Sequence, residues 1–217
     1  MLGIDIFRIV INIPIVLIAL TVHEFAHGWV SSKLGDPTPE RDGRLTLNPF
    51  AHLDLAGTIL MILTGFGWAK PVMVDPRYYK NQKKGMAITA AAGPLANLLM
   101  AIIGMIVYYS VVIIKEKFQI NMDFSTLLMF VYVFIYTNLC FMVFNIIPIP
   151  PLDGSKVLGL LLPNRVYYTM LQYERYSMIL IMVLSLTGVF GGIIGSGVNL
   201  IISLIDKPLL FLAGLIL

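Results

Sequence analysis

IFRIVINIPIVLIALTVHEFAHGWVSS, residues 6–32, is the stretch that decides the fold of this 217-residue chain. At about 1.5 Å of rise per residue, a helix over it is longer than the hydrocarbon core of a bilayer, which is roughly 30 Å thick. Residues 9–22 carry no charged side chain, and a glutamate and two histidines follow directly. Ionisable groups are costly at membrane depth unless they have a function. We therefore expect a membrane helix that carries a functional site.

The ionisable residues at the end of this stretch have the spacing H-E-x-x-H: His23, Glu24 and His27. Positions i and i+4 of a helix share one face, so the two imidazoles can bind a single Zn²⁺. Glu24 would lie beside the metal as the base for its water. The motif predicts a hydrolytic zinc centre inside the membrane, with one zinc ion per chain.

The composition is typical of a polytopic membrane protein. Hydrophobic residues make up 58% of the chain, charged residues only 12%, and the mean hydropathy is +0.87. A soluble domain is about 25% charged. The net charge of +3 is small, and no basic cluster interleaved with aromatic residues is present, so no nucleic-acid partner is expected. Cys140 is the only cysteine, which excludes an internal disulfide and a cysteine-based zinc site.

Other uncharged runs predict further membrane helices and an all-α fold. Residues 86–114 and 124–147 are each long enough to span the bilayer. Together with the first helix they give an expected three-helix core. We assign residues 1–160 to this core.

The C-terminal part, residues 161–217, is expected to add one or two membrane helices. An apolar run extends from residue 176 to residue 205. Five glycines from Gly188 onward should divide this run into a spanning helix and a second, shorter helix.

One apolar segment, residues 55–69, is too short for an ordinary crossing and has the length of a re-entrant segment. If it dips into the membrane and returns, eleven of the 15 Lys and Arg residues fall on one side, which the positive-inside rule makes cytoplasmic. They are Lys33, Arg41, Arg44, Lys70, Arg77, Lys80, Lys83, Lys84, Lys156, Arg165 and Arg175. We therefore expect a multi-pass protein of the cell membrane whose active site lies near the cytoplasmic side.

A catalytic zinc site needs three protein ligands and an open position, so a third ligand is required. Asp153 follows the third core helix in the segment N-I-I-P-I-P-P-L-D-G, where three prolines prevent a regular helix. Such backbone is tolerated at membrane depth only beside protein or a watery cavity. We therefore expect Asp153 to be the third ligand. His52 is the competitor, with a hydrogen bond to a loop carbonyl, a substrate contact or support of a ligand as its other roles.

The chain resembles the site-2 proteases, the membrane-embedded zinc metalloproteases of regulated intramembrane proteolysis. Three motifs carry the resemblance: T-V-H-E-F-A-H-G at 21–28, A-A-G-P-L-A-N-L-L at 91–99 and F-N-I-I-P-I-P-P-L-D-G at 144–154. The resemblance implies a three-helix catalytic core, with His23, His27 and Asp153 as zinc ligands and Glu24 as the catalytic acid and base. It also implies that Asn145 assists at the active site.

Two asparagines have alternative roles. Asn145 could donate a hydrogen bond to the developing oxyanion, or it could cap backbone groups that Pro148 leaves free. Asn97 follows A-G-P-L-A, where small residues allow helices to approach closely. We expect it to form an interhelical hydrogen bond rather than to act in catalysis, and it is also a candidate substrate-binding residue.

The sequence G-R-L-T-L-N-P-F-A-H-L-D resembles the bacterial and archaeal branch of these proteases, in which the region around residues 44–69 contributes short strands that dip into the membrane. Its alternating residues could pair with an extended substrate. They are Arg44, Leu45, Thr46, Leu47 and Asn48. The chain resembles a minimal type, without a PDZ insert or a cystathionine-synthase-type domain.

These observations predict an intramembrane zinc endopeptidase that hydrolyses a peptide bond in or near a transmembrane helix of a single-pass membrane protein. The oligomeric state is left open. A metal-ion transporter is the main alternative, but its ligands would be distributed along several helices as a pathway. A catalytically silent scaffold is a further alternative, although it would have no chemical need for Glu24.

Overall fold

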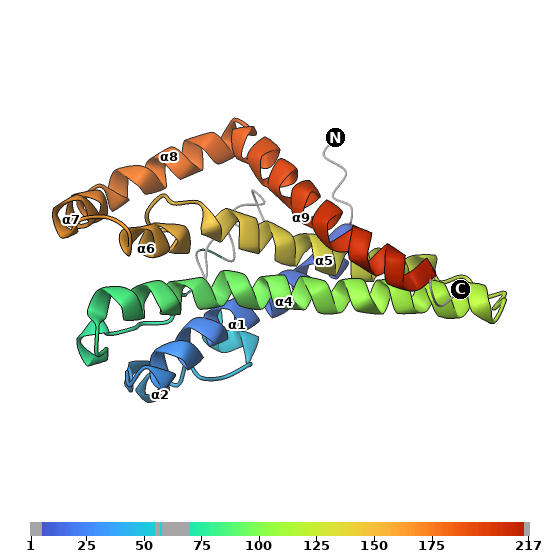
Figure 1. The fold of residues 1–217 in the computed structure, drawn as a ribbon, viewed down its shortest axis with the longest axis horizontal. Helices are drawn as coiled ribbons and strands as arrows, with labels where there is room; N and C mark the ends of the chain where they lie inside the picture. The colour runs from blue at the N-terminus through green and yellow to red at the C-terminus, as the bar shows by residue number, and fades with distance from the viewer. Residues whose placement is uncertain (1–5, 55–56, 58–69, 215–217) are drawn as a thin grey trace.

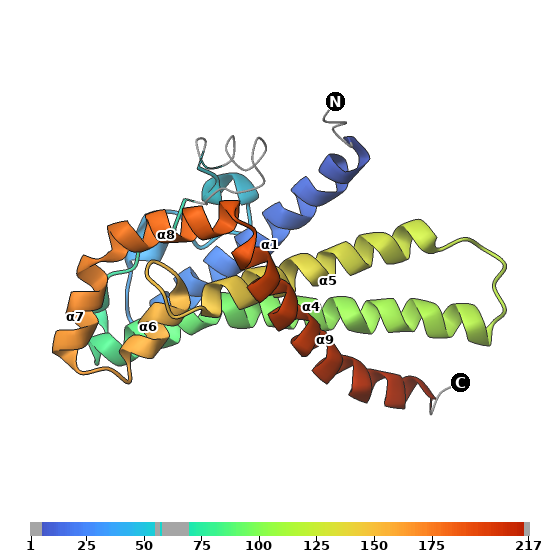
Figure 2. The same ribbon diagram turned by 90° about the horizontal axis from the view of Figure 1, so that it is seen from above.

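The computed structural model describes residues 6–54, 57 and 70–214. Three long helices lie side by side at its centre: α1 (Ile6–Lys33), α4 (Gln82–Lys117) and α5 (Ser125–Ile146). Figures 1 and 2 show α4 along the whole length of the molecule, with α1 crossing it and α5 beside it. These are the three predicted core helices, with bounds that differ from the expectation by a few residues.

Four helices are long and apolar enough to cross a membrane: α1 from Ile11 onward, α4, α5 and α9 (Val189–Gly214). The described ranges contain no strand. The prediction of an all-α polytopic membrane protein is therefore confirmed. Backbone groups in lipid must be satisfied within the chain, and a helix does this by itself.

The centre of the bundle is packed through small residues on α4. Ala101 is fully buried between the helices, and Gly104 is so close to Ile135 of α5 that a Cβ at residue 104 would overlap that side chain. Leu139 and Val198 complete the same apolar cluster from α5 and α9. Small residues let membrane helices approach closely, and helix association in lipid depends on this contact.

Short elements connect the helices at one end of the molecule. They are α2 (Thr38–Arg41), η1 (Pro49–His52), η2 (Pro76–Tyr78) and α6 (Asp153–Gly159). The described residues 44–48 are irregular, so the short β element expected there is absent from that part of the chain. The expected membrane-dipping segment, residues 55–69, lies outside the described residues except for Gly57.

The C-terminal part consists of α7 (Asn164–Gln172), α8 (Glu174–Leu186) and α9. The expected order of a spanning helix and then a shorter one is wrong, because α8 has 13 residues and α9 has 26. Gly188, with φ +77°, ends the first helix. The remaining glycines lie inside α9, where intrahelical hydrogen bonds make the helix the favoured backbone in lipid. One C-terminal helix, α9, is therefore long enough to cross.

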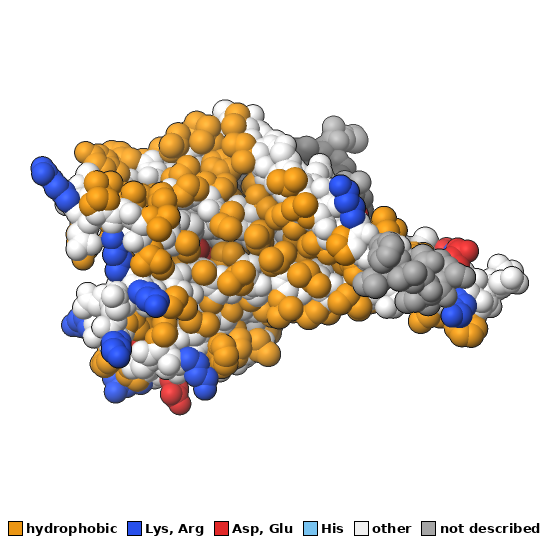
Figure 3. Space-filling view, in the orientation of Figure 1, with side chains coloured by type: hydrophobic (Ala, Val, Ile, Leu, Met, Phe, Trp, Pro, Cys, Tyr) orange, Lys and Arg blue, Asp and Glu red, His pale blue; other side chains and the backbone are white. Residues whose placement is uncertain are grey.

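The surface has the character of a protein in lipid. Figure 3 shows apolar side chains along the body of the molecule, with most of the visible basic side chains gathered at the end that holds α2, α7 and the start of α4. The α8–α9 corner packs through Ile181 and Phe190 onto Leu152, next to Asp153. The C-terminal helices thus pack against the proline-rich segment that leads to Asp153.

Candidate metal centre and active site

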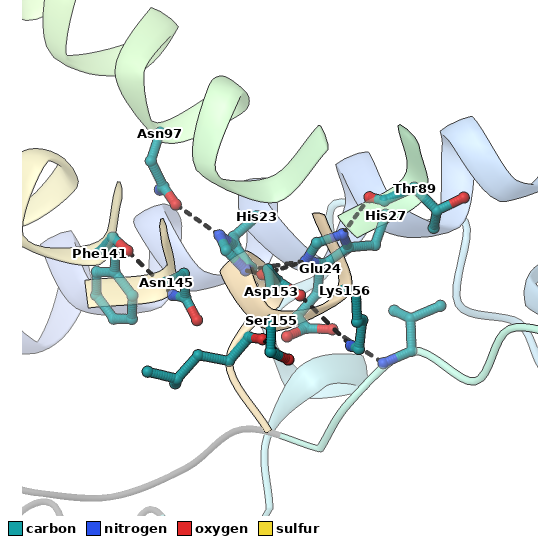
Figure 4. A network of polar contacts seen from close by, with 12 residues as sticks. His23, Glu24, His27, Thr89, Asn97, Phe141, Asn145, Asp153, Ser155 and Lys156 are labelled. Atoms are coloured by element: carbon teal, nitrogen blue, oxygen red, sulfur yellow. Dashed lines mark hydrogen bonds and ion pairs between the residues drawn. The ribbon is translucent and has the colours of Figure 1, made fainter. Parts of the chain in front are cut away.

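His23, His27 and Asp153 converge at one point in the structure, as Figure 4 shows. The two histidines lie on one face of α1, and Asp153 is the first residue of α6. The Nε2 atoms of the histidines are 3.0 Å apart, and they lie 3.2 Å and 3.1 Å from Oδ2 of Asp153. All three residues are buried.

The hydrogen bonds of the two imidazoles leave no N–H group directed at the point where the three residues converge. Nδ1 of His27 donates to the backbone carbonyl of Thr89 at 2.7 Å, and Nδ1 of His23 lies 2.7 Å from Oδ1 of Asn97. Each neutral ring therefore carries its proton on Nδ1 and turns a lone pair on Nε2 towards Asp153. Three acceptor atoms at this separation repel one another unless a cation lies among them.

A zinc ion fits this donor set. Neutral imidazole nitrogens and a carboxylate oxygen are common zinc ligands, and in a tetrahedral site such atoms lie roughly 3.3–3.5 Å apart. The separations here are slightly shorter, so a small relaxation admits the ion. Hydrogen bonds from Nδ1 to oxygen acceptors are what orient metal-bound histidines in proteins.

Asn97 links His23 to two further helices. It is fully buried on α4, and its Nδ2 donates to the carbonyl of Ala19 on α1 and to Oδ1 of Asn138 on α5, each at 3.0 Å. Asn138 donates in turn to the carbonyl of Phe134 at 2.9 Å. The interhelical hydrogen bond expected of Asn97 is therefore present, and the same side chain orients His23.

Gly93 gives the two imidazoles their space. A Cβ at this position of α4 would overlap Nε2 of both His23 and His27. The A-A-G-P-L-A motif thus brings a side of α4 without a side chain against the histidine pair, and the close approach of α1 and α4 depends on it.

Glu24 lies beside the histidine pair and faces a cavity of about 260 Å³. Its Oε2 accepts a hydrogen bond of 2.9 Å from the backbone amide of Val72. The cavity is lined by His23, Glu24, His27, Pro71, Val72, Val74, Met86, Thr89, Ala90, Asn145, Pro151, Leu152, Asp153 and Lys156. It brings a carboxylate base, a candidate metal site and polar side chains into one recess of the size of a few amino-acid side chains.

Two polar side chains line the same cavity from other elements. Nδ2 of Asn145 donates to the carbonyl of Phe141 at 3.0 Å, one turn back on α5, so this amide bonds backbone within its own helix. Nζ of Lys156 lies 3.5 Å from Oδ1 of Asp153. Lys156 adds a positive charge to the cavity.

Comparisons with known proteins show the family of this chain. A sequence model of peptidase family M50 matches residues 11–189, which is most of the chain. The chain belongs to peptidase family M50. The M50 match agrees with the resemblance to the site-2 proteases, and it makes the protein a membrane zinc metalloprotease with zinc as its cofactor.

Relatives of this M50 peptidase carry corresponding names. YwhC of Bacillus subtilis (strain 168), named as a zinc metalloprotease, is 40% identical over 79% of this chain and 78% of its own length. Rip2 of Mycobacterium tuberculosis (strain ATCC 25618 / H37Rv), also named as a zinc metalloprotease, is 25% identical over 81% of this chain and 66% of its own length. No solved structure matches the chain.

In this M50 peptidase His52 lies outside the candidate metal site. His52 is fully buried, and its Nε2 lies 2.9 Å from the carbonyl oxygen of Thr46. This is the loop-carbonyl contact that the sequence left open as one of its roles. His52 is not among the residues that line the cavity.

The expected substrate-contact residues follow a loop beside α1. Arg44 is buried and bonded to backbone carbonyls, whereas Leu47 is 62% exposed. Thr46 Oγ1 accepts a hydrogen bond from the amide of Asn48. A role of Leu45, Thr46, Leu47 and Asn48 in substrate pairing stays a prediction.

Sequence reasoning missed four contributors to the M50 site. Thr89 and Val72 act through backbone groups, which no residue pattern shows. Asn138 had a signal, because it is a polar residue in a strongly apolar helix. Lys156, three residues after Asp153, could have been noticed as a charge beside a candidate ligand.

A buried polar network supports Thr89 from the side of the loops. The hydroxyl of Tyr79 lies 3.2 Å from Oγ1 of Thr89 and 2.7 Å from Oγ of Ser31, which donates to Asp36 at 2.7 Å. Burial opposes the charge of Asp36, but hydrogen bonds from Thr38, the Asp75 amide and Ser31 outweigh it and lower its pKa below 3.8. Asp36 therefore acts as an ionised anchor of this network.

Proposed function

We propose that this M50 peptidase is an intramembrane endopeptidase that hydrolyses a peptide bond in or near a transmembrane helix of a single-pass membrane protein. The observation that carries the proposal is the cavity in which Glu24 lies beside the convergent atoms of His23, His27 and Asp153. Metal-assisted hydrolysis requires a base beside a metal site, and both lie here in one recess of a membrane helix bundle. Ionisable groups are costly at that depth unless they have such a function.

In this proposal His23, His27 and Asp153 bind the zinc ion. A zinc ion held by these residues would lower the pKa of a water molecule and polarise the scissile carbonyl. Glu24 takes the proton of the attacking water and returns it to the leaving amine. The Val72 amide holds the Glu24 carboxylate in the cavity with a hydrogen bond of 2.9 Å.

The oxygen that becomes negative in the transition state needs hydrogen-bond donors. Asn145 and Lys156 both line the cavity and both carry N–H groups. Asn145 can turn its amide from the Phe141 carbonyl towards a bound substrate, because that bond adds little to an already complete helix. We assign the oxyanion contact to Asn145, with Lys156 as the adjacent positive charge.

The substrate class follows from the location of the cavity. A peptide bond within a membrane helix is already hydrogen-bonded and dry, so the helix must unwind before water reaches it. An unwound segment needs new partners for its backbone. The loop residues 45–48 beside α1 are proposed to supply them.

The proposed orientation places the active site near the cytoplasmic side of the cell membrane. The cavity lies towards the end of the bundle that carries α2, α6 and α7, and most of the visible basic side chains gather at that end in Figure 3. Basic residues favour the cytoplasmic side. Residues 1–160 are proposed to form the catalytic core.

The test is cleavage of a detergent-solubilised transmembrane peptide by the purified protein and by Glu24→Gln. The variant is expected to bind one zinc ion per chain but to lose cleavage, since it keeps the ligands and lacks the base. Glu40→Gln, an exposed change on α2, is the matched control and should retain activity. Full activity of Glu24→Gln, or zinc uptake into liposomes by a protein that cleaves nothing, would contradict the proposal.

A further inference from the structure

A short segment, Lys70–Val74, passes directly over the catalytic face of α1 and is called the strap here. Pro71, Val72 and Val74 line the active-site cavity. The Val72 amide donates to Glu24, and this is the contact through which the strap reaches the catalytic carboxylate. The position of the strap therefore determines where Glu24 is held.

The strap is itself held by a buried arginine. The guanidinium of Arg44 donates from Nη2 to the carbonyls of Lys70 at 2.6 Å and Pro71 at 2.7 Å, and from Nη1 to the carbonyl of Ala51. Arg44 is only 6% exposed. A guanidinium offers five donors in a rigid planar fork, so it can join two backbone segments in one geometry.

The loop and the strap also pack against α1 at a single residue. A Cβ at Gly28, one turn after Glu24, would lie 3.0 Å from Leu45 and 3.3 Å from Val72. Leu45 of the loop and Val72 of the strap therefore pack closely against α1, the helix that carries Glu24. The amide of Lys70 adds a hydrogen bond of 3.0 Å to the carbonyl of His52.

We propose that Arg44 is a positioning residue for Glu24: it clamps the strap, and the strap presents the Val72 amide to the Glu24 carboxylate. The inference rests on the proposed role of Glu24 as the catalytic base. Arg44 lines no part of the cavity, so it acts through Val72 and not by touching the substrate.

The effect of losing the clamp follows from the geometry of proton transfer. A base must lie within hydrogen-bonding distance of the proton that it takes. Without Arg44, three carbonyls lose their donor and the strap can move from α1. A displacement of about 1 Å at a reacting group lowers rates by up to roughly 10²-fold.

The first experiment compares Arg44→Gln with Arg44→Lys and with the exposed Arg41→Gln in the zinc-loaded full chain. Arg44→Gln should lower kcat by about 10- to 100-fold, with KM within about threefold and zinc content unchanged. Arg44→Lys should recover part of kcat, because an ammonium group can still donate to the carbonyls. Arg41→Gln should behave as the wild type. Unchanged kcat in Arg44→Gln, or a loss of zinc or folding that accounts for the whole effect, would overturn the inference.

A second variant tests the path through the amide. Val72→Pro removes the N–H group that donates to Glu24 and leaves Arg44 in place, while Val72→Ala is the matched variant that keeps this N–H group. Val72→Pro should lower kcat to a similar extent, and the double variant with Arg44→Gln should be no worse than Val72→Pro alone. Independent, multiplicative losses would show that Arg44 does not act through this amide.

A third readout requires neither zinc nor substrate. Hydrogen exchange of the peptide that contains the strap should be faster in Arg44→Gln than in the wild type and unchanged in Arg41→Gln. Equal exchange rates in all three proteins would contradict the clamp. If the wild type itself cleaves no membrane peptide, the proposed function fails, whereas faster exchange in Arg44→Gln would still establish the clamp.

Discussion

Nδ1 of His23 and Oδ1 of Asn97 lie 2.7 Å apart, although 74 positions separate the two residues in the chain. The contact joins α1 to α4 inside the bundle, and Asn97 extends it to α5 through Asn138. The orientation of a candidate zinc ligand is therefore fixed by the packing of all three core helices. His27 has a similar dependence on α4 through the carbonyl of Thr89.

Asn97→Ala should weaken zinc binding by about 10- to 100-fold, because loss of a hydrogen-bond partner of a metal-bound histidine has effects of this size. Competition with a coloured zinc chelator measures the affinity. Asn145→Ala is the matched control: it removes an asparagine that lines the cavity and bonds the Phe141 carbonyl instead of a histidine, so zinc affinity should not change. Equal affinities of wild type and Asn97→Ala would contradict the role of this contact.

Gly93→Ala should abolish tight zinc binding. The added methyl group would overlap Nε2 of both histidines, and the close contact of α4 with α1 leaves them little room to withdraw. The zinc content of the purified protein provides the measurement. Leu95→Ala, a change of a 59% exposed residue on the same helix, should keep its zinc. A Gly93→Ala protein with full zinc content would show that the helices can separate here.

Asp36→Asn should destabilise the protein near pH 7 by roughly 1–3 kcal/mol, because charged hydrogen bonds of Asp36 are lost. The pKa of Asp36 is lowered in the folded protein, so its stabilising effect is present above 3.8 and decreases as the pH falls below that value. Thermal unfolding in detergent should therefore show a gap between variant and wild type that narrows below about pH 4. Asp42→Asn, an exposed change, is the control. A gap that is independent of pH would contradict an ionised Asp36.

The sequence was sufficient to predict the three core helices and the residues that converge on the candidate metal site. Long uncharged runs have one stable backbone in lipid, so their existence and approximate bounds follow from composition. H-E-x-x-H needs only the helical repeat to bring His23 and His27 together. Asp153 required a tertiary argument, and its convergence with the histidines in the structure agrees with it.

The structural features that the sequence could not predict depend on backbone groups and on the environment of the glycines. The carbonyl of Thr89 and the amide of Val72 belong to no residue type, so no pattern shows that they bind His27 and Glu24. Gly191 and Gly195 were expected to end a helix, but α9 continues through them, and no other element of the described structure lies within 4 Å of a Cβ placed there. In water such glycines weaken a helix, whereas in lipid the unpaired backbone is the costlier state.

The most direct test of the account is the zinc content of purified Asp153→Ala beside that of His52→Ala. Asp153 lies 3.2 Å or less from both histidine Nε2 atoms, whereas His52 is bonded to the carbonyl of Thr46 and lines no part of the cavity. We predict that Asp153→Ala loses its zinc and that His52→Ala keeps one ion per chain. Zinc retained in Asp153→Ala and lost in His52→Ala would contradict the assignment of the metal centre.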